Sequence, residues 1–197
     1  MLKVNYRSAI FACLVAGALA GCDNGAADEA QGGEQVSSET AAEQFTGTID
    51  RTFVGDAIPA VALSDPDGTS LALAEAAGTP VLLNLWATWC APCVAEMPLL
   101  DELAAELEGS VRVITVSEDI NGAEAVVPFF ERYGFANLPR WMDTNNDLAF
   151  KFGGGAALPL TVLYDAEGKE VWRVMGAYDW GSEDARALIA EAVAADG

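Results

Sequence analysis

The sequence contains no histidine, and this absence removes the most common metal ligand and the most common general base of proteins. Basic residues are also scarce: 10 Lys and Arg stand against 30 Asp and Glu, so the formal net charge is −20 at pH 7. Binding of nucleic acid needs a basic surface, so no nucleic-acid partner is expected. Of the four cysteines, two lie in the first 22 residues. The remaining two are too few for a four-ligand zinc site, and no metal is expected.

Long apolar runs are scarce as well. The run at residues 9–20 follows Lys3 and Arg7, and it is shorter than the roughly 20 residues that span a bilayer as a helix. A basic start followed by a short apolar run is typical of a secretory signal peptide. The run ends in Leu-Ala-Gly-Cys, which resembles a bacterial lipobox, so residues 1–21 are predicted to be a lipoprotein signal peptide and Cys22 the lipidated residue. Cleavage by an ordinary signal peptidase is the alternative, and it would release a soluble protein.

After this signal the composition changes to Ala, Gly, Gln, Ser, Asp and Glu, and no basic residue occurs before Arg51. Such a segment contains too little apolar surface to fold alone, and its like charges repel one another. We therefore expect residues 22–52 to form a flexible acidic tether with a reach on the order of 30 Å. Residues 53–197 are expected to form one folded domain.

Within that domain, Cys90 and Cys93 lie two residues apart, directly after the apolar run 81–85 and before a helical pattern that continues to Leu107. The run predicts a buried parallel strand, which places Cys90 at a strand-to-helix turn. Unpaired N–H groups at a helix N-terminus favour thiolate over thiol, and the thiolate is the nucleophile. One helical turn separates the two cysteines, so their sulfurs can form a disulfide. The pattern indicates a redox dithiol.

The longer sequence 84–98, Asn-Leu-Trp-Ala-Thr-Trp-Cys-Ala-Pro-Cys-Val-Ala-Glu-Met-Pro, resembles the TlpA/ResA branch of the thioredoxin superfamily. These proteins are membrane-tethered thiol–disulfide reductases outside the cytoplasm. The resemblance implies an α/β thioredoxin fold, in which helices flank a central mixed β-sheet, with an extra N-terminal β-hairpin. Residues 61–63 and 70–73 flank Asp-Pro-Asp-Gly, a turn sequence that suits this hairpin.

The remaining elements follow from local patterns. Apolar alternation predicts strands at 111–116, 161–164 and 170–174, and a short strand at 140–142. Apolar spacing predicts helices at 123–133 and 147–152, with a kink or late start at Pro128 in the first. A closing helix is expected from a Ser182 cap to about residue 195.

The resemblance also implies roles for single residues. Cys90 is the expected nucleophile and Cys93 the more buried resolving thiol. Leu158 and Pro159 resemble the family's cis-proline segment, which offers backbone to an extended substrate, although the glycine-rich sequence before it departs from the usual spelling. Trp86 and Trp89 are most simply interpreted as packing residues. Trp89, next to Cys90, could in addition present a flat contact surface to partner proteins.

A carboxyl group for proton transfer is the remaining requirement. Asn84 stands where thioredoxin itself has a buried aspartate, and Asn cannot accept the proton that Cys93 loses. Glu96 lies one helical turn beyond Cys93 and matches the glutamate of the TlpA/ResA pattern. We therefore predict that Glu96 is the acid/base group, with a pKa raised by apolar surroundings. A solvated helix residue is the alternative.

These observations predict a monomeric, periplasm-facing reductant of protein disulfides, anchored through lipid, preferably in the inner membrane. It needs no cofactor beyond the Cys90–Cys93 disulfide. The resemblance implies apo-cytochrome c or copper-site assembly proteins as substrates and a transmembrane thiol reductant as electron donor. Two alternatives remain. The first is a Cu(I) metallochaperone, for which only Met97 offers a nearby third ligand. The second is a peroxiredoxin-like peroxidase, in which two residues separate a threonine from the attacking cysteine, whereas only Trp89 separates Thr88 from Cys90.

Overall fold

The protein is described by a computed structural model that covers residues 45–153 and 157–194. The predicted signal peptide, Cys22, most of the tether and part of the glycine-rich segment before Leu158 lie outside the described residues. In the described part, no helix has both the length and the apolar character needed to cross a membrane.

One mixed sheet organises the domain. Its eight strands lie in the order β1-β8-β7-β4-β5-β6-β2-β3, with β4, β5 and β6 parallel and all other neighbours antiparallel. The strands are β1 (Thr48–Asp50), β2 (Ala62–Ser64), β3 (Ser70–Ala72), β4 (Val81–Trp86), β5 (Arg112–Ser117), β6 (Trp141–Met142), β7 (Leu160–Tyr164) and β8 (Glu170–Met175). The predicted strands are thus present within a residue or two of their expected bounds.

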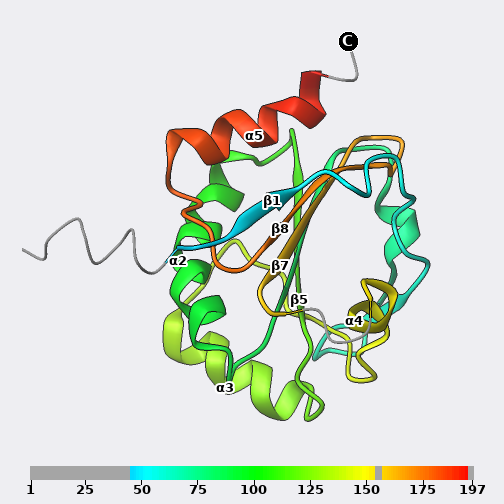
Figure 1. The fold of residues 1–197 in the computed structure, drawn as a ribbon. Coiled ribbons are helices and arrows are strands. Elements are labelled where there is room, and N and C mark those ends of the chain that lie inside the picture. The colour runs from blue at the N-terminus through cyan, green and yellow to red at the C-terminus, as the bar shows by residue number, and fades with distance from the viewer. Residues whose placement is uncertain (1–44, 154–156, 195–197) are drawn as a thin grey trace, which may run out of the picture. The chain divides into compact units, whose positions relative to one another are not determined.

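Helices cover both faces of this sheet (Figure 1). They are η1 (Leu73–Ala76), α2 (Ala91–Glu106), α3 (Ala123–Tyr133), α4 (Asp147–Lys151) and α5 (Glu183–Ala194). One core packs the sheet against α2, α3 and α5, and a second packs it against η1 and α4. Because both faces are covered, all six residues of β4 are buried, which explains why its sequence is continuously apolar except for Asn84. This is the predicted thioredoxin-like architecture.

The ends of the elements follow local chemistry. Cys90 caps α2, with Pro92 in the first turn, where a missing N–H costs nothing. The Ser182 hydroxyl accepts a hydrogen bond from the N–H of Ala185 at 3.1 Å and so caps α5 as expected. Helix α3 begins at Ala123, so Pro128 does not delay its start, and it ends at Tyr133 with Gly134 as a cap in the left-handed conformation.

The N-terminal boundary of the domain differs from the expectation. The predicted hairpin is present as β2 and β3, at the sheet edge beyond β6. However, β1 pairs with β8, so the folded domain includes residues 48–50, which the sequence had assigned to the tether. Arg51 strengthens this attachment through two 2.8 Å hydrogen bonds to Glu191 on α5. The acidic composition of this segment gives no sign of β1, because this strand is stabilised by its pairing with β8.

Candidate active site

The two cysteines of the motif lie at the N-terminus of α2 and are joined by a disulfide, with their Cα atoms 5.3 Å apart. The Sγ atom of Cys90 accepts a hydrogen bond from the backbone N–H of Cys93 at 3.3 Å. Cys90 is 6% exposed and Cys93 is fully buried. Cys90 is thus the more accessible of the two, and a helix N-terminus favours its thiolate. The roles of nucleophile for Cys90 and resolving thiol for Cys93 stay predictions.

Glu96 is buried in α2 one turn beyond Cys93, so it is not a solvated helix residue. Asn84 on β4 donates a 2.8 Å hydrogen bond to Oε1 of this carboxyl. On the other side, Oε2 accepts hydrogen bonds from the backbone N–H of Tyr178 at 2.9 Å and from Nε1 of Trp180 at 3.1 Å. Asn84 also donates to Thr161 on β7 at 2.9 Å. Two distant segments, β4 and the segment 178–180, therefore hold this carboxyl group directly, and β7 holds Asn84 in place.

Burial raises the pKa of Glu96 to about 7, although the hydrogen bonds from Tyr178, Asn84 and Trp180 favour the ionised form and lower it. Desolvation of a carboxylate dominates because nearly the whole side chain is removed from water. A carboxyl group with a pKa near 7 can both take and return a proton at neutral pH. The expectation of a raised pKa at Glu96 thus agrees with its surroundings.

The raised pKa of Glu96 gives stability a defined pH dependence. A carboxyl that titrates at about 7 when folded and near 4.5 when unfolded binds more protons in the folded state between these values. Its contribution is therefore fully present below pH 4.5 and is lost as the pH rises through 7. Over this pH interval the contribution of Glu96 to the free energy of unfolding should fall by about 3 kcal/mol. Denaturant unfolding of the oxidised protein from pH 4.5 to 8 should show this loss together with a loss from Glu118, whose pKa is also raised, to about 8. Glu96→Gln should make the total loss smaller by the Glu96 contribution; parallel curves for the two proteins would contradict the assignment.

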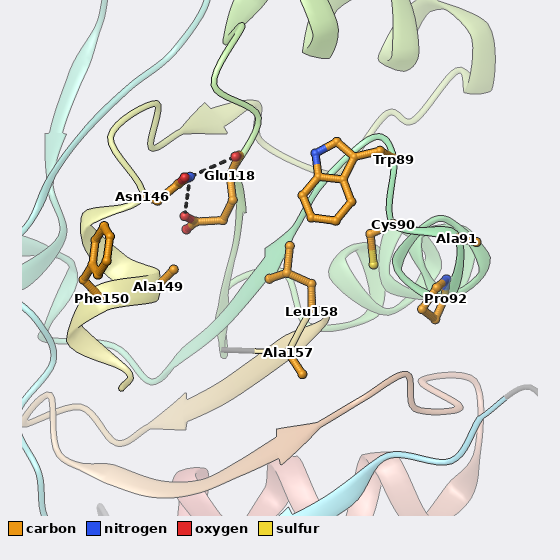
Figure 2. A pocket seen from close by; sticks show the side chains of 10 residues that line it. All are labelled: Trp89, Cys90, Ala91, Pro92, Glu118, Asn146, Ala149, Phe150, Ala157 and Leu158. Atoms are coloured by element: carbon orange, nitrogen blue, oxygen red, sulfur yellow. Dashed lines mark hydrogen bonds between the residues drawn. The ribbon is translucent and has the colours of Figure 1, made fainter. Parts of the chain in front are cut away.

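A pocket of about 750 Å³ opens beside Cys90 (Figure 2). Its described lining is mostly apolar and comes from the start of α2, the end of β5, α4 and the segment before β7: Trp89, Cys90, Ala91, Pro92, Glu118, Asn146, Ala149, Phe150, Ala157 and Leu158. Figure 2 shows Cys90 and Pro92 at one end, Glu118 and Asn146 at the other, and Trp89 and Leu158 between them. An extended segment of a protein substrate can lie across such a surface.

The peptide bond between Leu158 and Pro159 is cis, as the resemblance to the family's proline segment implied. Leu158 lines the pocket, whereas Pro159 lies just before β7 and its carbonyl accepts a 2.9 Å hydrogen bond from the N–H of Gly176. Because β7 pairs with β4, this segment is fixed beside the strand that leads into the cysteines. The substrate-binding role expected for Leu158 and Pro159 stays a prediction.

The two tryptophans of the motif have different environments. Trp86 is buried, and its ring centroid lies 4.9 Å from that of Phe129 on α3. Trp89 is 71% exposed, so the interpretation as a packing residue is wrong for this side chain. Its place on the pocket wall leaves the alternative role, a flat contact surface beside Cys90.

Sequence reasoning missed several residues that complete the site. Asp119 accepts hydrogen bonds from the backbone N–H and the hydroxyl of Thr88, at 2.9 and 2.8 Å, and so fixes the turn before Cys90. Glu118 and Asn146 line the pocket. The one available signal was that Glu118 and Asp119 follow a buried strand directly, at the sheet edge where sites of α/β proteins lie.

Comparison with known proteins agrees with this geometry. Residues 53–189 match the Redoxin family. The thiol-disulfide oxidoreductase ResA of Bacillus thuringiensis (strain Al Hakam) is 32% identical over 133 residues, which are 67% of this chain and 75% of that protein. Among solved structures, the pneumococcal exposed lipoprotein thioredoxin of Streptococcus pneumoniae is 29% identical, with a TM-score of 0.54 over 65% of this chain and 96% of that one. StoA of Bacillus subtilis shares the fold at 20% identity, with a TM-score of 0.56 over 68% and 98%. The chain therefore belongs to the Redoxin family and, within it, to the ResA-type thiol–disulfide oxidoreductases.

Proposed function

We propose that this protein is a lipid-anchored reductant of protein disulfides on the outer side of the bacterial inner membrane. The observation that carries the direction of electron flow is the buried carboxyl of Glu96, one turn from Cys93. Negative charge there disfavours thiolate at both cysteines, and Ala91 and Pro92 between them add no charge. Strong oxidants of this fold owe their potential to a very stabilised thiolate in the reduced form; here the helix N-terminus favours the Cys90 thiolate, but the residues between the cysteines add no further stabilisation and Glu96 opposes it.

The cycle begins with the reduced dithiol. The Cys90 thiolate attacks a sulfur of the substrate disulfide, a mixed disulfide forms, and the departing substrate thiolate takes a proton from solvent. Glu96 then takes the proton of Cys93, whose thiolate attacks the Sγ atom of Cys90 and releases the second substrate thiolate; this thiolate takes a proton from solvent, and Glu96 later returns its own proton to solvent. The substrate gains two electrons and two protons, and the enzyme is left with the Cys90–Cys93 disulfide. A transmembrane thiol reductant restores the dithiol by the same exchange in reverse.

The direction of electron flow can be measured by equilibrating the purified protein with thiol–disulfide buffers of graded potential. The half-reduction point should lie nearer to the value of thioredoxin, about −270 mV, than to that of the oxidant DsbA, about −120 mV. The two forms can be separated on gels after alkylation of free thiols. A half-reduction point near −120 mV would make the protein an oxidant instead.

The substrates we propose are proteins whose cysteines must be reduced before they receive haem or copper, namely apo-cytochrome c or copper-site assembly proteins. The sequence similarity to ResA-type proteins and the open apolar pocket beside Cys90 support a protein substrate. The exposed Trp89 offers such a partner a large contact surface at little cost in side-chain entropy.

The lipid anchor is tested by Cys22→Ser. Its support is the lipobox-like sequence before Cys22 and the similarity to a pneumococcal thioredoxin described as an exposed lipoprotein. The variant should move from the membrane fraction to the soluble fraction or stay uncleaved, and it should lose label from a radioactive fatty acid, with the disulfide reductase activity of the domain retained. Wild-type protein found only in the soluble periplasm would contradict the anchor.

A further inference from the structure

One end of the pocket holds a carboxyl group that the redox cycle does not use. Glu118 follows β5 and is only 5% exposed. Nδ2 of Asn146 donates to its Oε2 at 3.0 Å and to its backbone carbonyl at 2.9 Å. The other carboxyl oxygen, Oε1, is buried and has no hydrogen-bond donor among the described residues. A buried acceptor without a donor is costly, so this position favours a ligand that supplies one.

The charge around Glu118 favours a cation as that donor. Burial, together with the negative charges of Asp143 and Asp147, raises the pKa of Glu118 to about 8, although the hydrogen bond from Asn146 lowers it. No basic side chain is among the described residues that line the pocket. A cationic group placed there would find negative potential and one unsatisfied oxygen, and the net charge of −20 would attract it from a distance.

The remaining walls suit the stem of such a group. Trp89, which is 71% exposed, and Leu158 lie between the Cys90 end and Glu118, whereas Phe150, which is 70% exposed, and Ala149 lie at the Glu118 end near Asn146 (Figure 2). Lysine and arginine have aliphatic stems that pack on apolar surfaces, and their charged heads interact favourably with aromatic faces. A purely apolar side chain would leave the Glu118 oxygen without a donor.

We propose that this pocket binds a lysine or arginine of the substrate, placed one or two residues from the cysteine that Cys90 attacks, with Glu118 as the partner of its charged group. This inference rests on the proposed function as a reductant of protein disulfides. Since Glu118 lines the pocket while Oε1 itself is buried, a small rotation of the carboxyl group brings this oxygen to the entering cation. Glu118 then selects substrates and takes no part in the exchange of electrons.

The test uses short peptides that carry one cysteine as a mixed disulfide with 2-mercaptoethanol, with lysine, arginine, norleucine or glutamate two positions before it. Stopped-flow tryptophan fluorescence gives the rate constant for reaction of each peptide with the reduced wild-type protein. The lysine and arginine peptides should react about tenfold faster than the norleucine peptide, the usual scale for one partly desolvated charge pair, and the glutamate peptide should react slowest.

The ratio between the lysine and norleucine peptides should fall to about one in Glu118→Gln. Asp147→Asn is the matched control, because it removes one negative charge from the same region at a residue that does not line the pocket; it should keep most of the preference. Equal reaction of wild type with all four peptides, or an equal loss of preference in both variants, would overturn the inference. Failure of wild type to react with any peptide would overturn the proposed function as well.

A second measurement uses wild type alone and so does not depend on how the variants fold. Titration calorimetry at pH 7 in two buffers of different ionisation enthalpy counts the protons released when a serine analogue of the lysine peptide binds. Glu118, with its pKa near 8, should release close to one proton to pair with the lysine, and the norleucine analogue should release none. In the described part, the carboxyl groups whose charge acts on Glu118 are those of Asp143 and Asp147. Equal proton release with both analogues would contradict the pairing.

Discussion

Replacement of Cys93 by serine should leave Cys90 attached to its substrates as mixed disulfides. The second exchange needs a thiolate held beside the Cys90 sulfur, and no other cysteine of the described domain can replace the buried Cys93. Turnover should fall at least about 10²-fold, because a solution thiol lacks the high effective concentration of an intramolecular one. Non-reducing gels of membranes from producing cells should show adducts that disappear when a thiol reagent is added.

The matched control is Cys90→Ser, which keeps one cysteine in the motif but removes the accessible one. This variant should form few adducts, since Cys93 is fully buried. Adducts that form with Cys90→Ser and not with Cys93→Ser would reverse the assigned roles. Mass spectrometry of the trapped partners would also identify the substrates, and it would show whether apo-cytochromes or copper-assembly proteins are among them.

Glu96→Gln should slow resolution of a preformed Cys90 mixed disulfide by roughly 10²-fold at pH 7, within the usual range for general base catalysis. Cys93 is buried, so its thiolate is costly and a base must take its proton. With a pKa of about 7, Glu96 is half ionised at this pH and can accept that proton. Loss of its negative charge should also lower the apparent pKa of Cys90.

Stopped-flow measurements from pH 5 to 10 separate these two effects. The wild-type rate of resolution should rise with a midpoint near 7, whereas the variant should approach the wild-type rate only at the alkaline end, where hydroxide deprotonates Cys93 directly. Glu102→Gln is the control, because Glu102 is an exposed residue of the same helix. A Glu96→Gln protein with the rates and pH profile of wild type would reduce Glu96 to a structural residue.

The features that the sequence predicted well are local ones. The buried strand before Cys90, the cap at Ser182 and the turn between β2 and β3 each depend on a few neighbouring residues, and each is present in the structure. The positions of Cys90 and Cys93 follow from the same strand–turn–helix sequence. Short-range chemistry determines these features, so no knowledge of distant residues was needed.

The features that the sequence did not predict depend on contacts between distant segments. Tyr178 and Trp180 donate to Glu96 across more than 80 residues of sequence, and Asn146 reaches back to Glu118. Trp89 is exposed because it lies on the wall of an open pocket that distant segments form. The residue type alone predicts burial, so the sequence does not indicate this exposure. The sequence indicates that Asn84 cannot act as an acid, but not that its amide donates a hydrogen bond to the carboxyl of Glu96.

The dispersed support of Glu96 limits how this site could be engineered into another protein. Moving the α2 segment alone into a related scaffold would carry both cysteines and Glu96 but leave behind Asn84 on β4 and the loop that contains Tyr178 and Trp180. A buried carboxyl without these donors would have a still higher pKa, would remain protonated at neutral pH and could not accept the proton of Cys93. A working graft would have to include the loop after β8, even though its sequence contains no residue that would be recognised as catalytic.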